Sequence, residues 1–127
     1  MGEPYCDRDE SDPIPYSLGD SAPISMLFFE AGSDYDLTLC TITASVKASL
    51  DDPDSAALFR LTSDDGIALG PAPGNNQALF SPTSAQSATL AVRTYHFTVR
   101  IRDANNVVFT PFRGYLEGRL SGIVTPA

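Results

Sequence analysis

The chain has 127 residues, 43% of them hydrophobic, which is enough for one domain with its own core. Sixteen acidic and eight basic residues give a formal charge of −8, which argues against nucleic acid as a partner, because phosphate backbones are bound by clustered cationic side chains. No apolar run approaches the roughly 18 residues of a membrane span and no secretory signal opens the sequence, so we expect synthesis in the cytoplasm and no membrane partner.

Residues 1–20 are predicted to form an extended arm that is rich in proline and acidic residues. Proline fixes φ and removes a backbone donor, and the charges oppose burial, so we expect this stretch to build no core of its own. Within it, Ile14, Tyr16 and Leu18 alternate with other residues and could add to a sheet as an edge strand. Two ways of ordering the arm are open: an assembly partner, which we favour, or packing on its own domain. In the favoured case, deleting residues 1–20 leaves the body folded.

Residues 21–121 are predicted to form an antiparallel β-sandwich, followed by a tail at 122–127. Short segments of alternating hydrophobicity are separated about every ten residues by turns rich in Gly, Asp, Asn and Pro, and only residues 82–89 favour a helical turn. The expected strands are 23–30, 36–47, 56–61, 67–69, 77–80, 94–102 and 107–109, with 115–120 extending the last of them.

The clearest pattern lies in residues 94–109. The strand 94–102 has an apolar face made by Tyr95, Phe97, Val99 and Ile101 and a polar face made by His96, Thr98, Arg100 and Arg102. Residues 103–106 favour a turn, because Asp and Asn tolerate left-handed backbone conformations and bond their own backbone. A β-hairpin with one buried and one solvent-facing side is therefore expected.

We predict no catalytic, cofactor-binding or metal-binding residue. The single histidine, His96, lies on the polar strand face without a nucleophile motif. The acids at 51–54 and 64–65 could offer oxygen ligands to calcium, but their spacing does not match an EF-hand, and solvated turns are the better interpretation. Cys40 is expected to be buried on the strand face of Ile42, and a disulfide with Cys6 would require the arm to fold back over the core.

The arginines are the most suggestive charged residues, because guanidinium groups bind carboxylates through two parallel hydrogen bonds. Residues 1–54 hold twelve acids and two bases, whereas residues 55–127 hold four acids and six bases, so the two parts are expected to face different neighbours. Two partners for Arg100 and Arg102 stay open: the acidic arm of this or a neighbouring copy, and Glu117 across the sheet.

Several stretches of the chain follow a common pattern: Leu18-Gly19-Asp20, Asp36-Leu37-Thr38, residues 54–69 with their Leu61-Thr62 and Gly66-Ile67 pairs, residues 94–99 and residues 113–118. Together they resemble the Ig-like domain found at the amino terminus of phage baseplate upper proteins. The resemblance covers about residues 18–124. It implies an Ig-like sandwich of about seven strands with an extended amino-terminal arm, and family members serve as non-enzymatic structural parts.

From this resemblance we expect a structural component of a phage virion that docks onto neighbouring subunits, as a capsid decoration or cement protein or as a tail or baseplate accessory protein. The expected partners are other virion proteins, including copies of this chain. The residues expected to make contact are Tyr5, Ile14, Tyr16 and Leu18 in the arm and Arg100, Arg102, Phe112 and Arg113 in the body. The alternative is a carbohydrate- or receptor-binding Ig-like module, although the loops 51–54 and 71–76 lack the aromatic residues that would favour it.

Overall fold

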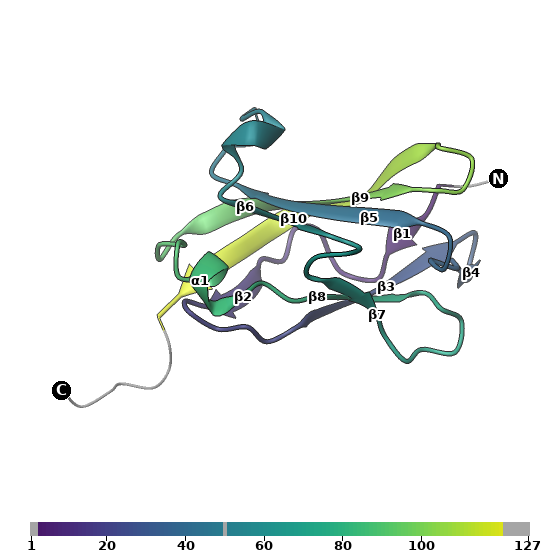
Figure 1. The fold of residues 1–127 in the computed structure, drawn as a ribbon, viewed down its shortest axis with the longest axis horizontal. Helices are drawn as coiled ribbons and strands as arrows, with labels where there is room; N and C mark the ends of the chain where they lie inside the picture. Colours follow the sequence, from purple (N-terminus) through teal and green to yellow (C-terminus); the bar gives the residue numbers. More distant parts are fainter. Residues whose placement is uncertain (1–2, 50, 121–127) are drawn as a thin grey trace.

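A computed structural model describes residues 3–49 and 51–120, which form two β-sheets packed face to face (Figure 1). The strands are β1 (Tyr5–Cys6), β2 (Ile14–Ser17), β3 (Ile24–Glu30), β4 (Ser33–Asp34), β5 (Thr41–Lys47), β6 (Phe59–Thr62), β7 (Ile67–Leu69), β8 (Gln77–Phe80), β9 (Thr94–Arg102) and β10 (Val108–Arg119). One sheet has the order β1-β3-β8-β7, with β4 pairing to β3, and the other has the order β2-β10-β9-β5-β6. The predicted β-sandwich is confirmed, and the predicted tail at 122–127 lies outside the described residues.

The order of the strands is that of an Ig-like sandwich. The strands β1, β3, β7 and β8 correspond to strands A, B, D and E of an Ig domain, and β5, β9 and β10 correspond to C, F and G. The first sheet then has the order A-B-E-D, and the three central strands of the second sheet have the order G-F-C. Short helical segments complete the chain: the 3-10 turn η1 (Asp54–Ala56) and the helix α1 (Ser84–Ser87). The helical turn expected at 82–89 is thus present, capped by Thr83 and Gln86 in a reciprocal capping box.

Four phenylalanines fill the space between the sheets, since the chain has no tryptophan. Phe28, Phe80, Phe97 and Phe112 are all fully buried. Phe97 packs edge-on against Phe80, with ring centroids 5.9 Å apart, and against Phe112 at 6.1 Å, which is the arrangement that the charge distribution of aromatic rings favours.

The hairpin predicted at 94–109 is confirmed as β9 and β10. The carboxylate of Asp103 accepts the backbone N–H groups of Asn105 and Val107, each at 2.9 Å, and Asn106 takes a left-handed conformation with φ 64°. Along β9 the buried and solvent-facing residues alternate as expected, so Arg100 and Arg102 point away from the core.

A bulge in β10 changes the orientation of the residues that follow it. Phe109 pairs with Ile101 and Phe112 pairs with Val99, so the returning strand has one residue more than β9 between these pairs. The segments predicted at 107–109 and 115–120 form one strand, in which Pro111 lies within the bulge, and the strand runs without a break to Arg119. The extra residue turns Phe112 inward, where it is fully buried.

The arm is part of the sandwich rather than a detached extension. β1 pairs antiparallel with β3 in one sheet, and β2 pairs parallel with β10 in the other. Ile14 and Tyr16 are each only 5% exposed and belong to the core, and the Tyr16 hydroxyl donates to the carbonyl of Ala22 at 2.8 Å. The favoured interpretation, an arm ordered by a partner, is therefore wrong for β1 and β2, which pair with β3 and with the open edge of β10 in their own domain.

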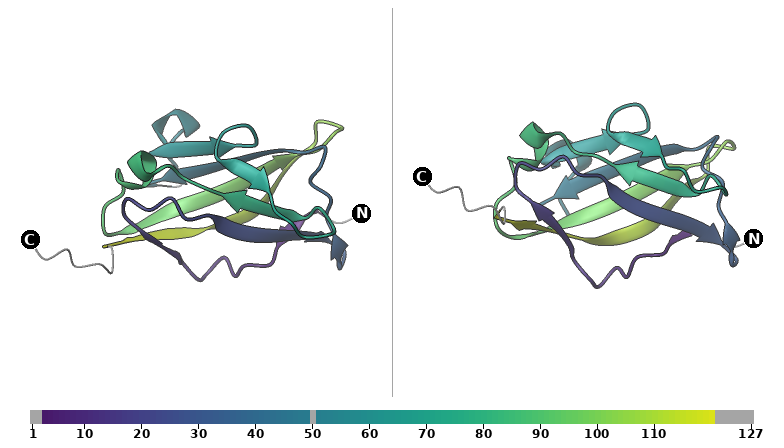
Figure 2. Two further views of the ribbon diagram at one scale, coloured as in Figure 1. Left: turned by 60° about the horizontal axis from the view of Figure 1, so that its bottom comes forward. Right: turned by 90° about the horizontal axis from the view of Figure 1, so that it is seen from below.

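Residues 7–13 connect β1 to β2 and cross from one sheet to the other; we call this segment the acidic crossover. Figure 2 shows it as the purple stretch that runs along the outside of one edge of the sandwich. The edge made by β6 and β7 is the opposite one, because these strands end the other side of each sheet. The crossover and the β6 edge therefore face different directions.

The strand expected at 36–47 is shorter than predicted, because it begins only at Thr41. Leu37 is buried and accepts the backbone N–H of Cys40 at 3.0 Å, which closes a turn ahead of β5. Ile42, Ala44 and Val46 face the core as expected, whereas Cys40 is only partly buried.

Candidate interaction face

The outer face of the sheet β2-β10-β9-β5-β6 collects most of the basic residues. Within residues 3–49 and 51–120, the strands of this sheet carry six basic residues and a single acidic one, Glu117. The remaining charged residues of the chain are fifteen acids and two bases. The basic residues of the sheet are Lys47, Arg60, Arg100, Arg102, Arg113 and Arg119. An acidic protein thus presents one basic side.

A shallow hollow of ≈ 420 Å³ lies on this face, and we call it the arginine hollow. Its lining comes from four neighbouring strands: Thr41, Thr43 and Ser45 on β5, Arg60 on β6, Arg100 and Arg102 on β9, and Val108 on β10. Strand pairing sets these residues side by side, since Ser45 is opposite Arg60, Thr43 is opposite Arg100, and Thr41 is opposite Arg102.

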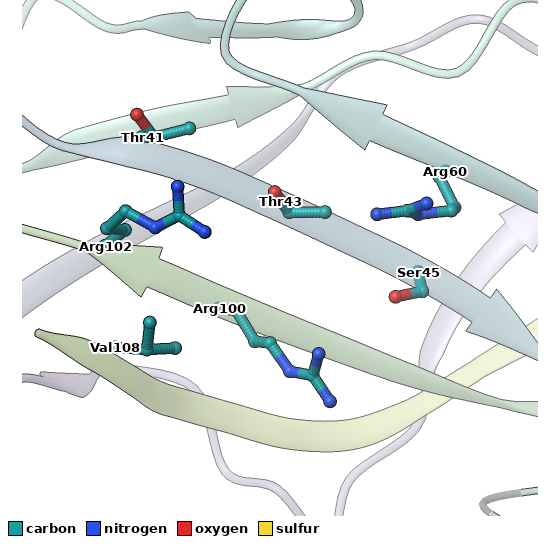
Figure 3. A pocket seen from close by; sticks show the side chains of 7 residues that line it. All are labelled: Thr41, Thr43, Ser45, Arg60, Arg100, Arg102 and Val108. Atoms are coloured by element: carbon teal, nitrogen blue, oxygen red, sulfur yellow. The ribbon is translucent and has the colours of Figure 1, made fainter. Parts of the chain in front are cut away.

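Two guanidinium groups converge in the arginine hollow. Figure 3 shows Arg60 and Arg102 pointing toward Thr43 from opposite sides, whereas Arg100 extends over β10. Among the described residues, no hydrogen bond or ion pair engages the side chain of Arg60 or Arg102. Two guanidinium groups flanking a row of hydroxyls supply donors suited to the oxygens of a carboxylate or another compact anion.

The rest of the face makes contacts within the domain. Arg119 forms an ion pair with Glu117, and among the described residues Glu117 does not pair with Arg102, one of the two possibilities left open by the sequence. The His96 and Tyr115 rings pack with centroids 5.4 Å apart, and the Lys47 ammonium donates to the carbonyl of Asp52 at 3.0 Å. His96 therefore packs against Tyr115 on the polar face of β9.

The acidic crossover is the counterpart of the arginine hollow. Asp7, Asp9, Glu10 and Asp12 are exposed, whereas the one base in the segment, Arg8, turns inward and donates to the carbonyl of Ser25 at 3.1 Å. Hydrogen bonds from Ser11 lower the pKa of the Asp9 carboxyl below its usual range, so this group is ionised at neutral pH. The outer surface of the crossover is consequently acidic.

The structure separates the predicted contact residues into two groups. Arg100, Arg102 and Arg113 are exposed on the basic face, Tyr5 is 46% exposed beside β3, and Leu18 is partly buried. The prediction that Ile14, Tyr16 and Phe112 contact a partner is wrong, because all three belong to the core: β2 closes the sheet edge, and the bulge in β10 turns Phe112 inward.

Sequence reasoning missed Arg60 and the hydroxyl row of β5. The alternation of Thr41, Thr43 and Ser45 with buried residues was a usable signal for an outward row of hydroxyls. Arg60 also alternates with buried neighbours, but only the pairing of β5 with β6 places it beside Ser45. The register of this strand pair depends on both strands together, so it could not be predicted from the sequence of either strand alone.

The two cysteines are free thiols. Burial raises the pKa of Cys6 to about 12 and also raises the pKa of Cys40. Burial, together with the neighbouring Cys40, raises the pKa of the Tyr35 hydroxyl to about 12. Low reactivity is expected for thiols with such values, because the thiolate is the reactive form.

The described part of the chain contains neither a cluster of metal ligands nor a membrane-spanning helix. Among residues 3–49 and 51–120, no three His, Cys, Asp or Glu side chains are grouped so that they could hold a metal ion. Neither helical segment of that part of the protein is long and apolar enough to cross a membrane. The basic face is the feature from which a function can be argued.

No protein-family model matches the chain, and no curated protein matches it. Among solved structures it is similar to the crystal structure of CopC from Methylosinus trichosporium OB3b, with 12% sequence identity and a TM-score of 0.44 over 95% of this chain and 100% of that one.

Proposed function

We propose that the chain is a non-enzymatic structural component of a phage virion. In this proposal it is made in the host cytoplasm and docks onto neighbouring subunits, as a capsid decoration or cement protein or as a tail or baseplate accessory protein. The Ig-like strand order fits the family that the sequence resembles. The observation that carries the proposal is the basic outer face, because a protein of net charge −8 has gathered most of its arginines on one exposed sheet.

Docking through this face differs from docking through a free arm. The side chains of Ile14 and Tyr16 are buried in the core of the domain, so they cannot contact a neighbouring subunit. The arginines are exposed and lie on rigid strands, so a partner would find them already in position, and little ordering entropy would oppose binding. The proposed partners are other virion proteins, and neither nucleic acid nor a membrane.

Incorporation into particles tests this proposal. We would compare wild-type protein, Arg60→Gln/Arg102→Gln, and the control Arg93→Gln, which removes an exposed arginine that lies outside the basic sheet. Each would be supplied during infection by the phage that encodes the chain, and purified particles would be assayed by quantitative mass spectrometry. The proposal predicts wild-type and control protein in the particles and a loss of about tenfold or more for the hollow variant. Absence of the wild-type chain from purified particles would contradict it.

The alternative of a carbohydrate-binding module has one observation in its favour. The arginine hollow combines guanidinium groups with the hydroxyls of Thr41, Thr43 and Ser45, which together could bind an acidic sugar. Binding of the isolated protein to acidic glycans, abolished in Arg60→Gln/Arg102→Gln, would support this alternative. Absence of glycan binding combined with incorporation into particles would favour the structural role.

A further inference from the structure

The chain carries two surfaces of opposite charge that cannot satisfy each other within one copy. Within the described residues, the acidic crossover bonds to the basic face at one point, where the Glu10 carboxylate accepts the backbone N–H of Arg113 on β10 at 2.6 Å. The arginine hollow lies farther across the sheet, over β9, β5 and β6. In the described chain, no carboxylate of the crossover bonds to Arg60 or Arg102.

We propose that the occupant of the arginine hollow is the acidic crossover of a second copy of this chain. This inference deepens the proposed assembly function and rests on it, because it names one partner of the basic face. Asp9 and Asp12 are exposed carboxylates three residues apart, on a segment whose only base is turned inward. Two carboxylates of this kind match the two convergent guanidinium groups of Arg60 and Arg102.

Charge argues for a protein segment rather than an extended polyanion. Outside the strands of the basic sheet, the chain holds fifteen acids against two bases, so a nucleic acid running beyond the hollow would meet a repulsive surface. A crossover loop is compact enough to stay within the hollow. At physiological ionic strength the screening length is about 8 Å, so the local attraction acts while the net repulsion between two acidic copies is largely screened.

The contact joins different surfaces on the two copies and is therefore head-to-tail. The crossover lies at the β1 and β2 edge, and the hollow extends to β6 at the other edge. Each copy consequently keeps one unused crossover and one unused hollow after the first contact, so association continues to a ring or a filament. High salt is expected to dissociate it.

Two variants, each blocked on one surface, test the arrangement directly. Arg60→Gln/Arg102→Gln removes the hollow. Asp9→Asn/Asp12→Asn neutralises the crossover, and the amide oxygen introduced at position 9 can still accept the backbone N–H of Ser11, as the Asp9 carboxylate does. Arg93→Gln, which lies outside the basic sheet, serves as the control. Masses of the purified proteins would be measured by light scattering over a concentration series at about 0.15 M and about 1 M salt, where the screening length falls from about 8 Å to about 3 Å.

The expected result is specific to a head-to-tail contact. Wild type and control exceed the monomer mass of 13.6 kDa with rising concentration at the lower salt and return to it at the higher salt. Each blocked variant alone stays a monomer at concentrations about tenfold above the wild-type association midpoint. An equimolar mixture of the two blocked variants forms a 1:1 complex of twice 13.6 kDa, because one intact hollow meets one intact crossover.

Several results would overturn the inference. A wild-type protein that stays monomeric up to millimolar concentration, a blocked variant that associates as strongly as wild type, or a mixture that forms no 1:1 complex would each do so. The proposed function fails separately: head-to-tail association in solution, with no chain in purified particles, would contradict the virion role and leave the contact intact.

Discussion

Cys6 illustrates how burial sets chemistry at the scale of one residue. Its thiol lies partly buried at the end of β1, where the sulfur accepts the backbone N–H of Arg8 at 3.5 Å and donates to the Asp7 carboxylate at 3.6 Å. Desolvation is the main cause that raises its pKa from 9.0 to about 12. The native protein therefore holds this proton more tightly than the unfolded chain does.

Alkylation should report this difference. At about pH 8, we expect iodoacetamide to modify Cys6 at least about tenfold more slowly in the folded protein than in urea, because the folded thiol is almost entirely protonated. Because the pKa of Cys6 is higher in the folded protein than in the unfolded chain, its contribution to the free energy of unfolding is complete below pH 9.0. This contribution is lost as the pH rises toward about 12. Peptide mass spectrometry over a time course measures the rate, and equal rates in both states would show that Cys6 is exposed.

At the scale of elements, we expect the edge strand β2 to contribute strongly to the stability of the sandwich. Ile14→Ala removes a core side chain that is 5% exposed, and we expect a loss of about 2–5 kcal/mol in the free energy of unfolding. The neighbouring Pro15→Ala is the matched control, because Pro15 faces solvent and its replacement should change stability by about 0.5 kcal/mol or less. Urea unfolding followed by circular dichroism compares them. Equal stability of the two variants would mean that the arm is detachable after all.

The elements that could be predicted are those with local signals. The β9–β10 hairpin has an alternating strand next to an Asp and Asn turn, so its pairing and its outward arginines follow from neighbouring residues. The pairing of β2 with β10 joins residues about one hundred positions apart in parallel, and no local pattern announces it. The bulge in β10 could not be predicted either. A strict alternation of inward and outward residues across 109–112 places Phe112 on the solvent-facing side, whereas the bulge turns it into the core.

The same limit applies to the candidate site. Arg100 and Arg102 were identified because both lie on one strand with a period of two. Arg60 and the β5 hydroxyls join them only through strand register, and the inward turn of Arg8 depends on a hydrogen bond to Ser25. The sequence shows that acidic residues concentrate in the first part of the chain. Which face of the protein is basic could be known only from the fold.

At the scale of the whole molecule, the fold converts a charge difference along the chain into one in space. The amino-terminal segment closes one edge of the sandwich and carries its acids there, while the hairpin and β6 place arginines on the outer face of one sheet. A particle built from such subunits can use one surface as donor and the other as acceptor without any change of fold. The proposed assembly therefore depends on the basic face.

Arginine footprinting in assembled particles tests this most directly. Purified particles and free protein would be treated with phenylglyoxal and analysed by mass spectrometry, with Arg93 as the internal reference because it is exposed away from the arginine hollow. We expect Arg60 and Arg102 to react in the free protein and to be protected about fivefold or more in particles, while Arg93 reacts in both. Equal modification of all three arginines in particles would contradict it.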